Sequence, residues 1–128
     1  MTTTLTDSRE KLSALTDQFV AAFNRQDIDA VMSFFAENAV YRDAYDKSHE
    51  GLAAIRKAFE PVLNGKLGKI NFAGEDRFID AEAGKVMDSW VLHMHMGEGA
   101  DKEASMTGLD LLSFEKDKLV RKTTYRRG

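Results

Sequence analysis

The spacing of apolar residues changes at Lys69, and this change constrains the fold more than any other feature of the chain. Before Lys69, apolar residues recur every three or four positions, which predicts amphipathic helices. After it they alternate with polar residues, which predicts strands with one buried face. The 128 residues are enough for one domain with a single core. The sequence therefore predicts one α+β domain over residues 1–128, with helices first, strands after them and a disordered tail over residues 1–7.

Two helices are expected ahead of the first strand. Asp7, with Glu10 three residues later, has the pattern of a capping box, which predicts a first helix over residues 8–25. Asp27 is suited to cap a second, short helix. The apolar faces of the two helices are expected to consist of Leu12, Leu15, Phe19, Val20 and Phe23, and of Ile28, Val31, Met32 and Phe35.

A strand over residues 39–43 and a polar loop, AYDKSHEG, are expected to lead to a third helix. Pro61 lies inside the helical pattern and is expected to kink or end the helix, because it lacks an N–H group and clashes with the preceding turn. Asn64 and Gly65 form a natural C-terminal stop. The apolar face of this helix is expected to consist of Leu52, Ile55, Phe59 and Leu63.

Four strands are expected over residues 69–80, 85–96, 102–115 and 118–126, joined by the turns AEAG, GEGA and KD. Short turns make consecutive strands antiparallel. Strands of this length twist and coil, so the sheet is expected to curve. Helices gathered on one face of a curved sheet enclose a cone-shaped pocket, and concave, mostly apolar pockets bind small molecules.

The composition excludes several classes of function. The net charge is −3, which gives no broad attraction to nucleic acid, and the basic end RKTTYRR reads as a solvated edge strand. There is no cysteine, so thiolate nucleophiles, disulfides and cysteine-based zinc sites are excluded. No apolar signal segment and no run of membrane-spanning length occurs. We therefore expect a cytoplasmic protein that binds neither membrane nor nucleic acid.

Asp43 is unusual because it follows directly on an apolar strand pattern. Strand alternation places Tyr41 and Asp43 on one face and Val40 and Arg42 on the other. If Tyr41 lines the cavity, Asp43 lines it too and can serve as a base at its mouth. Alternatively, the strand ends at Asp43 and the carboxylate meets water or caps the following loop.

Asp110 lies within MTGLDLLSF, in the middle of a strand, where aspartate is depleted. A buried carboxylate loses solvation, which favours the protonated carboxyl, and a protonated carboxyl can donate a hydrogen bond. Alternatively, Asp110 points outward and pairs with a Lys or Arg on a neighbouring strand.

His93 and His95 lie on one face of the second long strand. Their spacing could hold a metal with a carboxylate as a further ligand. The opposite face, with Trp90, Leu92, Met94 and Met96, is more apolar, so we place the histidines on the outer face, in solvent or in a subunit interface. The apolar set would then line the cavity, although ordinary core packing explains it equally well.

Two segments, QFVAAFNRQDIDAVMSFFAENAVYRDAYDKSHEGLAAIRKAFEPVL and TGLDLLSFEKDKLVRKTTY, resemble the ketosteroid isomerase-like branch of the nuclear transport factor 2-like superfamily. The SnoaL-like polyketide cyclases and limonene epoxide hydrolase are further relatives. The resemblance spans residues 12–126 and implies a cone-shaped, curved antiparallel sheet with three N-terminal helices, also called cystatin-like. It is fairly specific for the fold and only weakly specific for the chemistry, because this scaffold hosts many functions.

The resemblance implies roles for two carboxylates. Asp43 takes the position of the isomerase's catalytic base, and Asp110, in D-x-x-x-F, that of the protonated Asp that donates to the oxyanion. This carboxyl pair is a known example in ketosteroid isomerase. Phe19 stands where the isomerase has its main oxyanion donor, a Tyr, and phenylalanine cannot donate. The epoxide hydrolase's charged positions hold Trp90, Leu92 and Thr124, and the SnoaL-like Asp falls on or near Thr124.

The expected function is therefore that of an enzyme that moves a proton next to a carbonyl of a hydrophobic substrate, as an isomerase, cyclase or lyase without a cofactor or metal. Asp43 and Asp110 are the expected catalytic residues. The alternative is a non-catalytic domain that keeps the ligand pocket. A homodimer is expected through the outer face of the sheet, which carries Met87, Val91, Leu109 and Leu111. The substrate pocket is expected to be lined by Phe19, Tyr41, Phe59, Trp90, Leu92, Met94, Leu112 and Tyr125.

Overall fold

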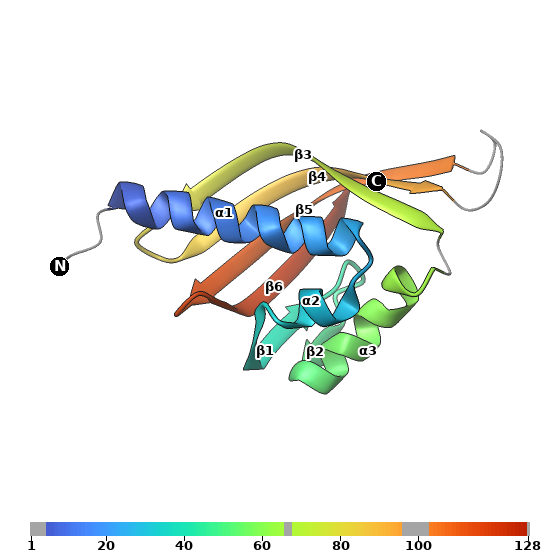
Figure 1. Cartoon of the computed structure of the whole chain (residues 1–128), viewed down its shortest axis with the longest axis horizontal. Helices are drawn as coiled ribbons and strands as arrows, with labels where there is room; N and C mark the ends of the chain where they lie inside the picture. The colour runs from blue at the N-terminus through green and yellow to red at the C-terminus, as the bar shows by residue number, and fades with distance from the viewer. Residues whose placement is uncertain (1–4, 66–67, 96–102, 128) are drawn as a thin grey trace.

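The structure is a computed structural model, and it describes residues 5–65, 68–95 and 103–127. The chain forms three helices and six strands, arranged in space as in Figure 1. The helices are α1 (Leu5–Asn24), α2 (Ile28–Met32) and α3 (Leu52–Leu63). The strands are β1 (Phe35–Arg42), β2 (Ser48–Glu50), β3 (Lys69–Asp80), β4 (Lys85–His95), β5 (Glu103–Glu115) and β6 (Lys118–Arg127).

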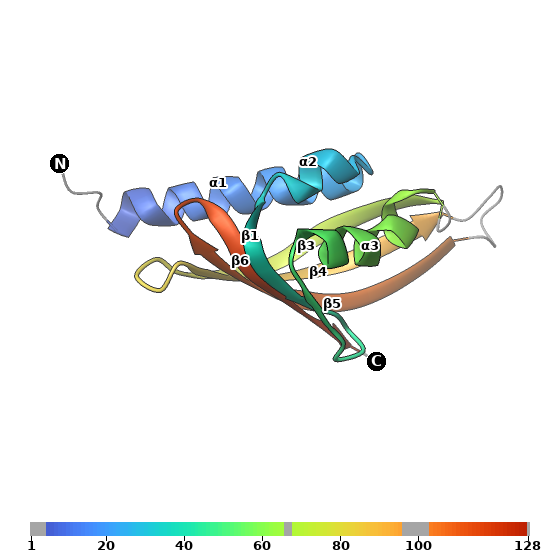
Figure 2. The ribbon, with the colours of Figure 1, turned by 90° about the horizontal axis from the view of Figure 1, so that it is seen from below.

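The six strands form one curved sheet in the order β2-β1-β6-β5-β4-β3. The last four strands are an antiparallel meander, as predicted, while β1 joins its edge parallel to β6. Figure 2 shows the three helices gathered on one side of the sheet, with α1 lying along it. The molecule therefore has the predicted α+β architecture, and the long strands hold their helix-facing side chains in fixed rows.

The core lies between α1, α3 and the concave face of the sheet, and phenylalanine rings occupy its centre. Phe19 makes edge contacts with Phe23 and Phe35 at centroid distances of 5.1 and 5.7 Å. Phe23 in turn meets Phe59 of α3 at 5.0 Å. Along β4, buried and less buried residues alternate, so that Val86, Asp88, Trp90 and Leu92 face inward. Edge contacts of this kind add to the burial of the rings and fix the two helices over the sheet.

Two expected boundaries in the helical half are wrong, and Pro61 does not end the third helix. The first helix begins at Leu5, ahead of Asp7, so Asp7 does not cap it, and residues 5–7 belong to the helix. Phe35 starts β1 instead of ending α2, since its backbone pairs with Leu119 of β6. The third helix continues through Pro61 to Leu63. The tertiary contacts of its buried face explain how the helix tolerates one missing hydrogen bond.

The segment expected to be a polar loop contains the short strand β2, which pairs antiparallel with β1. Its three residues are too few for a periodic pattern, so pairing with β1 defines the strand. Lys116 and Asp117 form the predicted tight turn between β5 and β6, and both have positive φ. The predicted turn GEGA and Met96 lie outside the described residues. No described helix is long and apolar enough to cross a membrane.

Candidate active site

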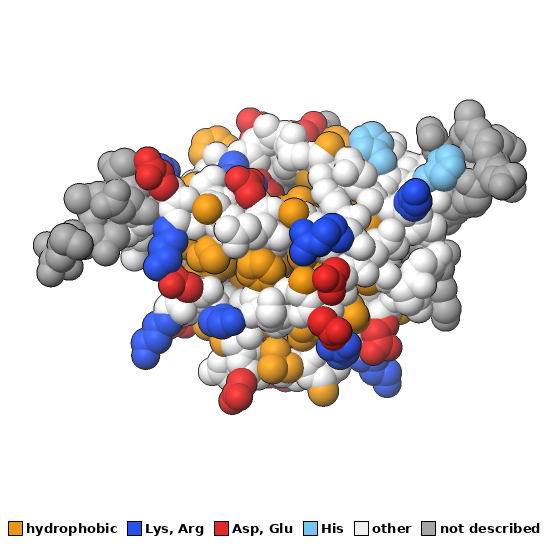
Figure 3. Space-filling view, viewed as in Figure 1, with side chains coloured by type: hydrophobic (Ala, Val, Ile, Leu, Met, Phe, Trp, Pro, Cys, Tyr) orange, Lys and Arg blue, Asp and Glu red, His pale blue; other side chains and the backbone are white. Residues whose placement is uncertain are grey.

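A cavity of about 470 Å³ opens between the concave face of the sheet, α1 and α3. This volume is typical of pockets for small organic ligands. Aromatic and aliphatic side chains form most of the wall, and three groups of charged side chains interrupt it. In Figure 3 a band of apolar side chains is visible along α1, with charged side chains of both signs beside it. The predicted site residues along this wall are Phe19, Tyr41, Asp43, Phe59, Trp90, Leu92, Met94 and Asp110.

Two predicted pocket residues are not among the described residues that line the cavity, and these expectations are wrong. Leu112 is on the inner face, but it is only 2% exposed and is sealed in the core. Tyr125 is 54% exposed, because strand alternation turns it away from its cavity-lining neighbours Thr124 and Arg126. Leu112 therefore contributes to packing, and Tyr125 belongs to the outer surface.

Asp43 is held at the cavity wall by the turn that follows β1. Its Oδ1 accepts backbone N–H groups of Tyr45 and Lys47 at 2.9 and 3.0 Å. Its Oδ2 lies 2.9 Å from Nε2 of His49. Burial acts to raise the pKa of Asp43, but the hydrogen bonds from His49, Lys47 and Tyr45 outweigh it and hold that pKa below its usual value. The sequence alternatives were thus not exclusive, since Asp43 both stabilises the turn and lines the cavity.

His49 was missed in the sequence, and the structure makes it the closest side-chain partner of Asp43. It sits on β2, directly opposite Tyr41 of β1, and the two rings stack at a centroid distance of 5.4 Å. The side chains of His49 and Asp43 are only 14% and 19% exposed. Among the described residues, Nδ1 of His49 has no hydrogen-bond partner. A carboxylate that holds one imidazole nitrogen fixes the orientation of the ring and leaves the other nitrogen for proton transfer.

Asp110 combines both of its expected orientations. It lines the cavity, and it pairs with Lys122 of the neighbouring strand β6, whose Nζ is 3.3 Å from its Oδ1. The Thr124 hydroxyl donates to the same oxygen at 2.6 Å. In these contacts Asp110 is the acceptor, whereas the sequence led us to expect a donor. Lys122 itself is 5% exposed, so the expectation of a solvated edge strand was wrong at this position.

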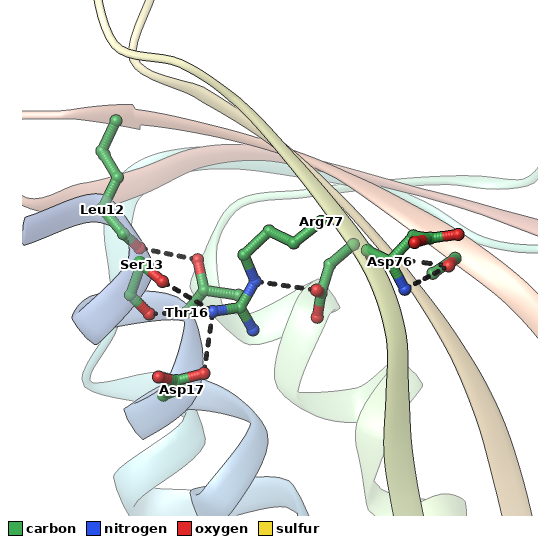
Figure 4. A network of polar contacts seen from close by, with 8 residues as sticks. Leu12, Ser13, Thr16, Asp17, Asp76 and Arg77 are labelled. Atoms are coloured by element: carbon green, nitrogen blue, oxygen red, sulfur yellow. Dashed lines mark hydrogen bonds and ion pairs between the residues drawn. The ribbon is translucent and has the colours of Figure 1, made fainter. Parts of the chain in front are cut away.

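A third charged group connects the cavity wall to α1 (Figure 4). Arg77 of β3 donates from Nε to Asp88 at 2.9 Å and from Nη1 to Asp17 of α1 at 2.8 Å. The same Nη1 contacts the hydroxyl and the carbonyl oxygen of Ser13 at 2.9 and 3.2 Å. Burial acts to lower the pKa of Arg77, but its bonds to Asp88 and Asp17 and their negative charges raise it further above its usual value. Arg77 therefore remains charged and fixes α1 to the sheet.

His93 and His95 lie on the exposed side of β4, and neither lines the main cavity. This is the outer placement that the apolar alternation of the strand predicts.

Comparison with known proteins gives a family and a fold. The SnoaL-like domain family matches residues 16–122 of this chain. A candidate polyketide cyclase from Xanthomonas campestris pv. campestris superposes with a TM-score of 0.76 at 19% identity, over 94% of this chain and 93% of that one. A candidate SnoaL-like polyketide cyclase from Shewanella denitrificans OS-217 gives 0.76 at 17% identity, covering 91% and 90%.

A third solved structure, a hypothetical protein with a ketosteroid isomerase-like fold from Catenulispora acidiphila DSM 44928, contains trimethylamine. It has a TM-score of 0.70 and 18% identity, and covers 87% of this chain and 83% of its own. No curated protein matches the chain. At these identities the structural likeness establishes the fold, and the reaction has to be argued from the residues in the cavity.

Proposed function

Because the chain belongs to the SnoaL-like domain family, we propose that it is an enzyme that moves a proton next to a carbonyl group of a hydrophobic small molecule. The observation that carries this proposal is the Asp43–His49 pair, with 2.9 Å between carboxylate and imidazole, in the wall of an otherwise largely apolar cavity. An apolar wall binds the body of the substrate, and a charged pair beside it supplies acid–base chemistry.

The hydrogen bonds of Asp43 indicate which member of the pair transfers the proton. Asp43 was expected to be the base, but its carboxylate already accepts three hydrogen bonds and its pKa is lowered, which makes it a weak base near neutral pH. We therefore assign the proton transfer to His49 and the positioning of its ring to Asp43. The C–H proton passes to Nδ1 of His49, and the electron pair of that bond moves toward the carbonyl oxygen. The enolate then takes the proton back at another atom, so no co-reactant is needed.

The second candidate is a binding domain without catalysis, and one observation favours it. Phe19, at the position of the isomerase's donor hydroxyl, is 2% exposed and packed against other phenylalanine rings. A ligand pocket needs no donor at that point, whereas an enolising enzyme needs one from another residue.

Hydrogen–deuterium exchange of 2-tetralone, followed by NMR, separates the two candidates. Wild-type protein should accelerate exchange next to the carbonyl. His49→Gln should lower the rate by about 10²-fold or more, because the amide cannot take up the proton. His93→Gln is the matched control, since His93 is exposed and does not line the cavity. Binding of 2-tetralone without exchange by wild-type protein would favour the binding domain.

We also propose that two copies associate through the outer face of the meander. Phe78, Met87 and Leu111 stand opposite one another across β3, β4 and β5, and Phe78 and Leu111 are 66% and 40% exposed. Such a row can pack against the same apolar face of a second copy. Sedimentation equilibrium should give a dimer for wild-type protein and a monomer for Leu111→Lys. A wild-type monomer at micromolar concentration would contradict this proposal.

A further inference from the structure

Lys122 places an ammonium group inside the cavity wall, among aromatic rings. Its Nζ lies 4.5 Å from the ring centre of Tyr41, 5.5 Å from that of Phe59 and 5.8 Å from that of Phe23. Lys122 and all three rings line the cavity. Ring faces attract a cation, and this attraction strengthens where water is excluded. The nitrogen of Lys122 therefore lies where a ligand in the cavity would bind.

The polar partners of Lys122 leave part of its hydrogen-bonding capacity open. An ammonium group has three N–H donors. One donates to Oγ1 of Thr124 at 2.8 Å, and the Asp110 carboxylate forms an ion pair with Nζ at 3.3 Å. Among the described residues this leaves at least one donor without a protein acceptor. Asp110 and Thr124 also fix the direction of Nζ, because Thr124 donates to the same Asp110 oxygen at 2.6 Å.

His49 and Lys122 flank the same tyrosine. In the sheet, Tyr41 of β1 stands opposite His49 of β2 on one side and opposite Lys122 of β6 on the other. The contact distances of the two groups to the Tyr41 ring place the imidazole centre and Nζ within about 10 Å of each other. A ligand of two fused rings with polar groups at both ends is long enough to span this separation.

We propose that the Lys122 ammonium is a catalytic residue that binds the carbonyl oxygen of the substrate and stabilises the enolate, with Asp110 as its positioning residue. This inference rests on the proposed function and names its substrate class, a cyclic carbonyl compound whose enolate is bound as an anion. As the C–H proton passes to His49, negative charge develops on the carbonyl oxygen. Lys122 donates a hydrogen bond to that oxygen and keeps its own proton. It thereby takes the role of the hydroxyl that Phe19 lacks.

The test uses 4-nitrophenol as a stable mimic of the enolate and nitrobenzene as its neutral counterpart. Binding is read from the fluorescence of Trp90, the only tryptophan in the chain and a residue of the cavity wall. At a pH where the phenol is ionised, wild-type protein should bind 4-nitrophenolate about 10-fold or more tightly than nitrobenzene, as expected for a hydrogen bond to a charged group. Lys122→Met should remove this preference. Lys57→Met, an equal charge change at an exposed position of α3, should behave as wild type.

A second variant is needed because Lys122→Met leaves the Asp110 charge without its partner, which can destabilise the fold. The double variant Lys122→Met with Asp110→Asn removes both charges and should show the same loss of preference. The inference is overturned if wild-type protein shows no preference for 4-nitrophenolate, or if either folded variant keeps it. If the inference is overturned in this way but exchange of 2-tetralone still depends on His49, the proposed function stands. A preference that depends on Lys122, with no exchange in wild-type protein, would instead refute the proposed function and leave an anion site.

Discussion

Charged side chains meet the cavity in two regions that are built differently. The first region, here called the helix anchor, consists of Arg77, Asp88, Asp17 and Ser13, and its hydrogen bonds join β3 and β4 to α1. The second, here called the cavity pairs, consists of Asp43 with His49 and Asp110 with Lys122. Among the described residues, the polar contacts of the cavity pairs stay within the sheet and the turn after β1. The two regions are nevertheless adjacent, since Asp88 stands directly opposite Asp110 across β4 and β5.

This difference separates charges that hold the fold together from charges that are available to a ligand. Arg77 of β3 bonds to three residues, two of them on α1, so removing it takes away bonds that hold α1 to the sheet. His49 and Lys122 each have one carboxylate partner and donor or acceptor capacity beyond it. Perturbed or partly satisfied charged groups in a cavity are typical of functional sites. The comparison therefore predicts that the helix anchor controls stability and the cavity pairs control chemistry.

The largest expected effect comes from Arg77→Met. It leaves the 5% exposed Asp88 without its cation, and removing one partner of a buried ion pair costs about 3 kcal/mol or more. Urea unfolding measures this loss. Arg121→Met, the same change at an exposed position of β6, should cost less than about 0.5 kcal/mol. Equal stability of the two variants would show that the helix anchor does not hold α1.

A smaller effect is expected from Gly108→Ala, which disturbs the cavity floor without changing any charge. A Cβ at this position would lie 2.5 Å from the backbone oxygen of Tyr125 and 2.6 Å from the Trp90 ring. Neither group can move freely, so we expect a loss of about 1–3 kcal/mol and a changed Trp90 emission spectrum. Gly74→Ala is the control, since a Cβ there meets nothing within 4 Å. An unchanged melting temperature in Gly108→Ala would mean that the floor is loosely packed.

The smallest effect concerns the pH dependence of the Asp43 contribution to stability. The pKa of Asp43 is lowered on folding, so its carboxylate stabilises the fold above the unfolded value of about 3.9. This contribution is lost as the pH falls through the lower folded pKa. The melting-temperature difference between wild type and Asp43→Asn should therefore shrink between about pH 7 and about pH 2. Asp76→Asn, at an exposed position, is the control, and a difference that stays constant with pH would contradict the assignment.

Local pattern was sufficient for most of the fold. The bounds of β3 were predicted to the residue, because alternation over a long strand is a strong signal. The end of α3 was also predicted, from Asn64 and Gly65. The failures are at positions where distant pairing overrides the local pattern, such as Phe35, which pairs with Leu119.

The same distinction between local pattern and distant pairing applies to the site. Asp43 and Asp110 were conspicuous because a carboxylate is unusual where a strand pattern is apolar.

The sequence by itself thus determined the element order apart from β2, the curved sheet, the cavity and two of its carboxylates, because the signals for these come from residues close together in the chain. Only the tertiary structure decided what those carboxylates do. The ionisation and availability of a charged group depend on burial and on its partners, and these come from other strands and helices. Asp43 contacts His49 because β2 pairs with β1, and Asp110 contacts Lys122 because β6 pairs with β5. A basic residue in a polar run carries no local sign that a sheet will bury it among aromatic rings, which is why Lys122 was found only in the folded chain.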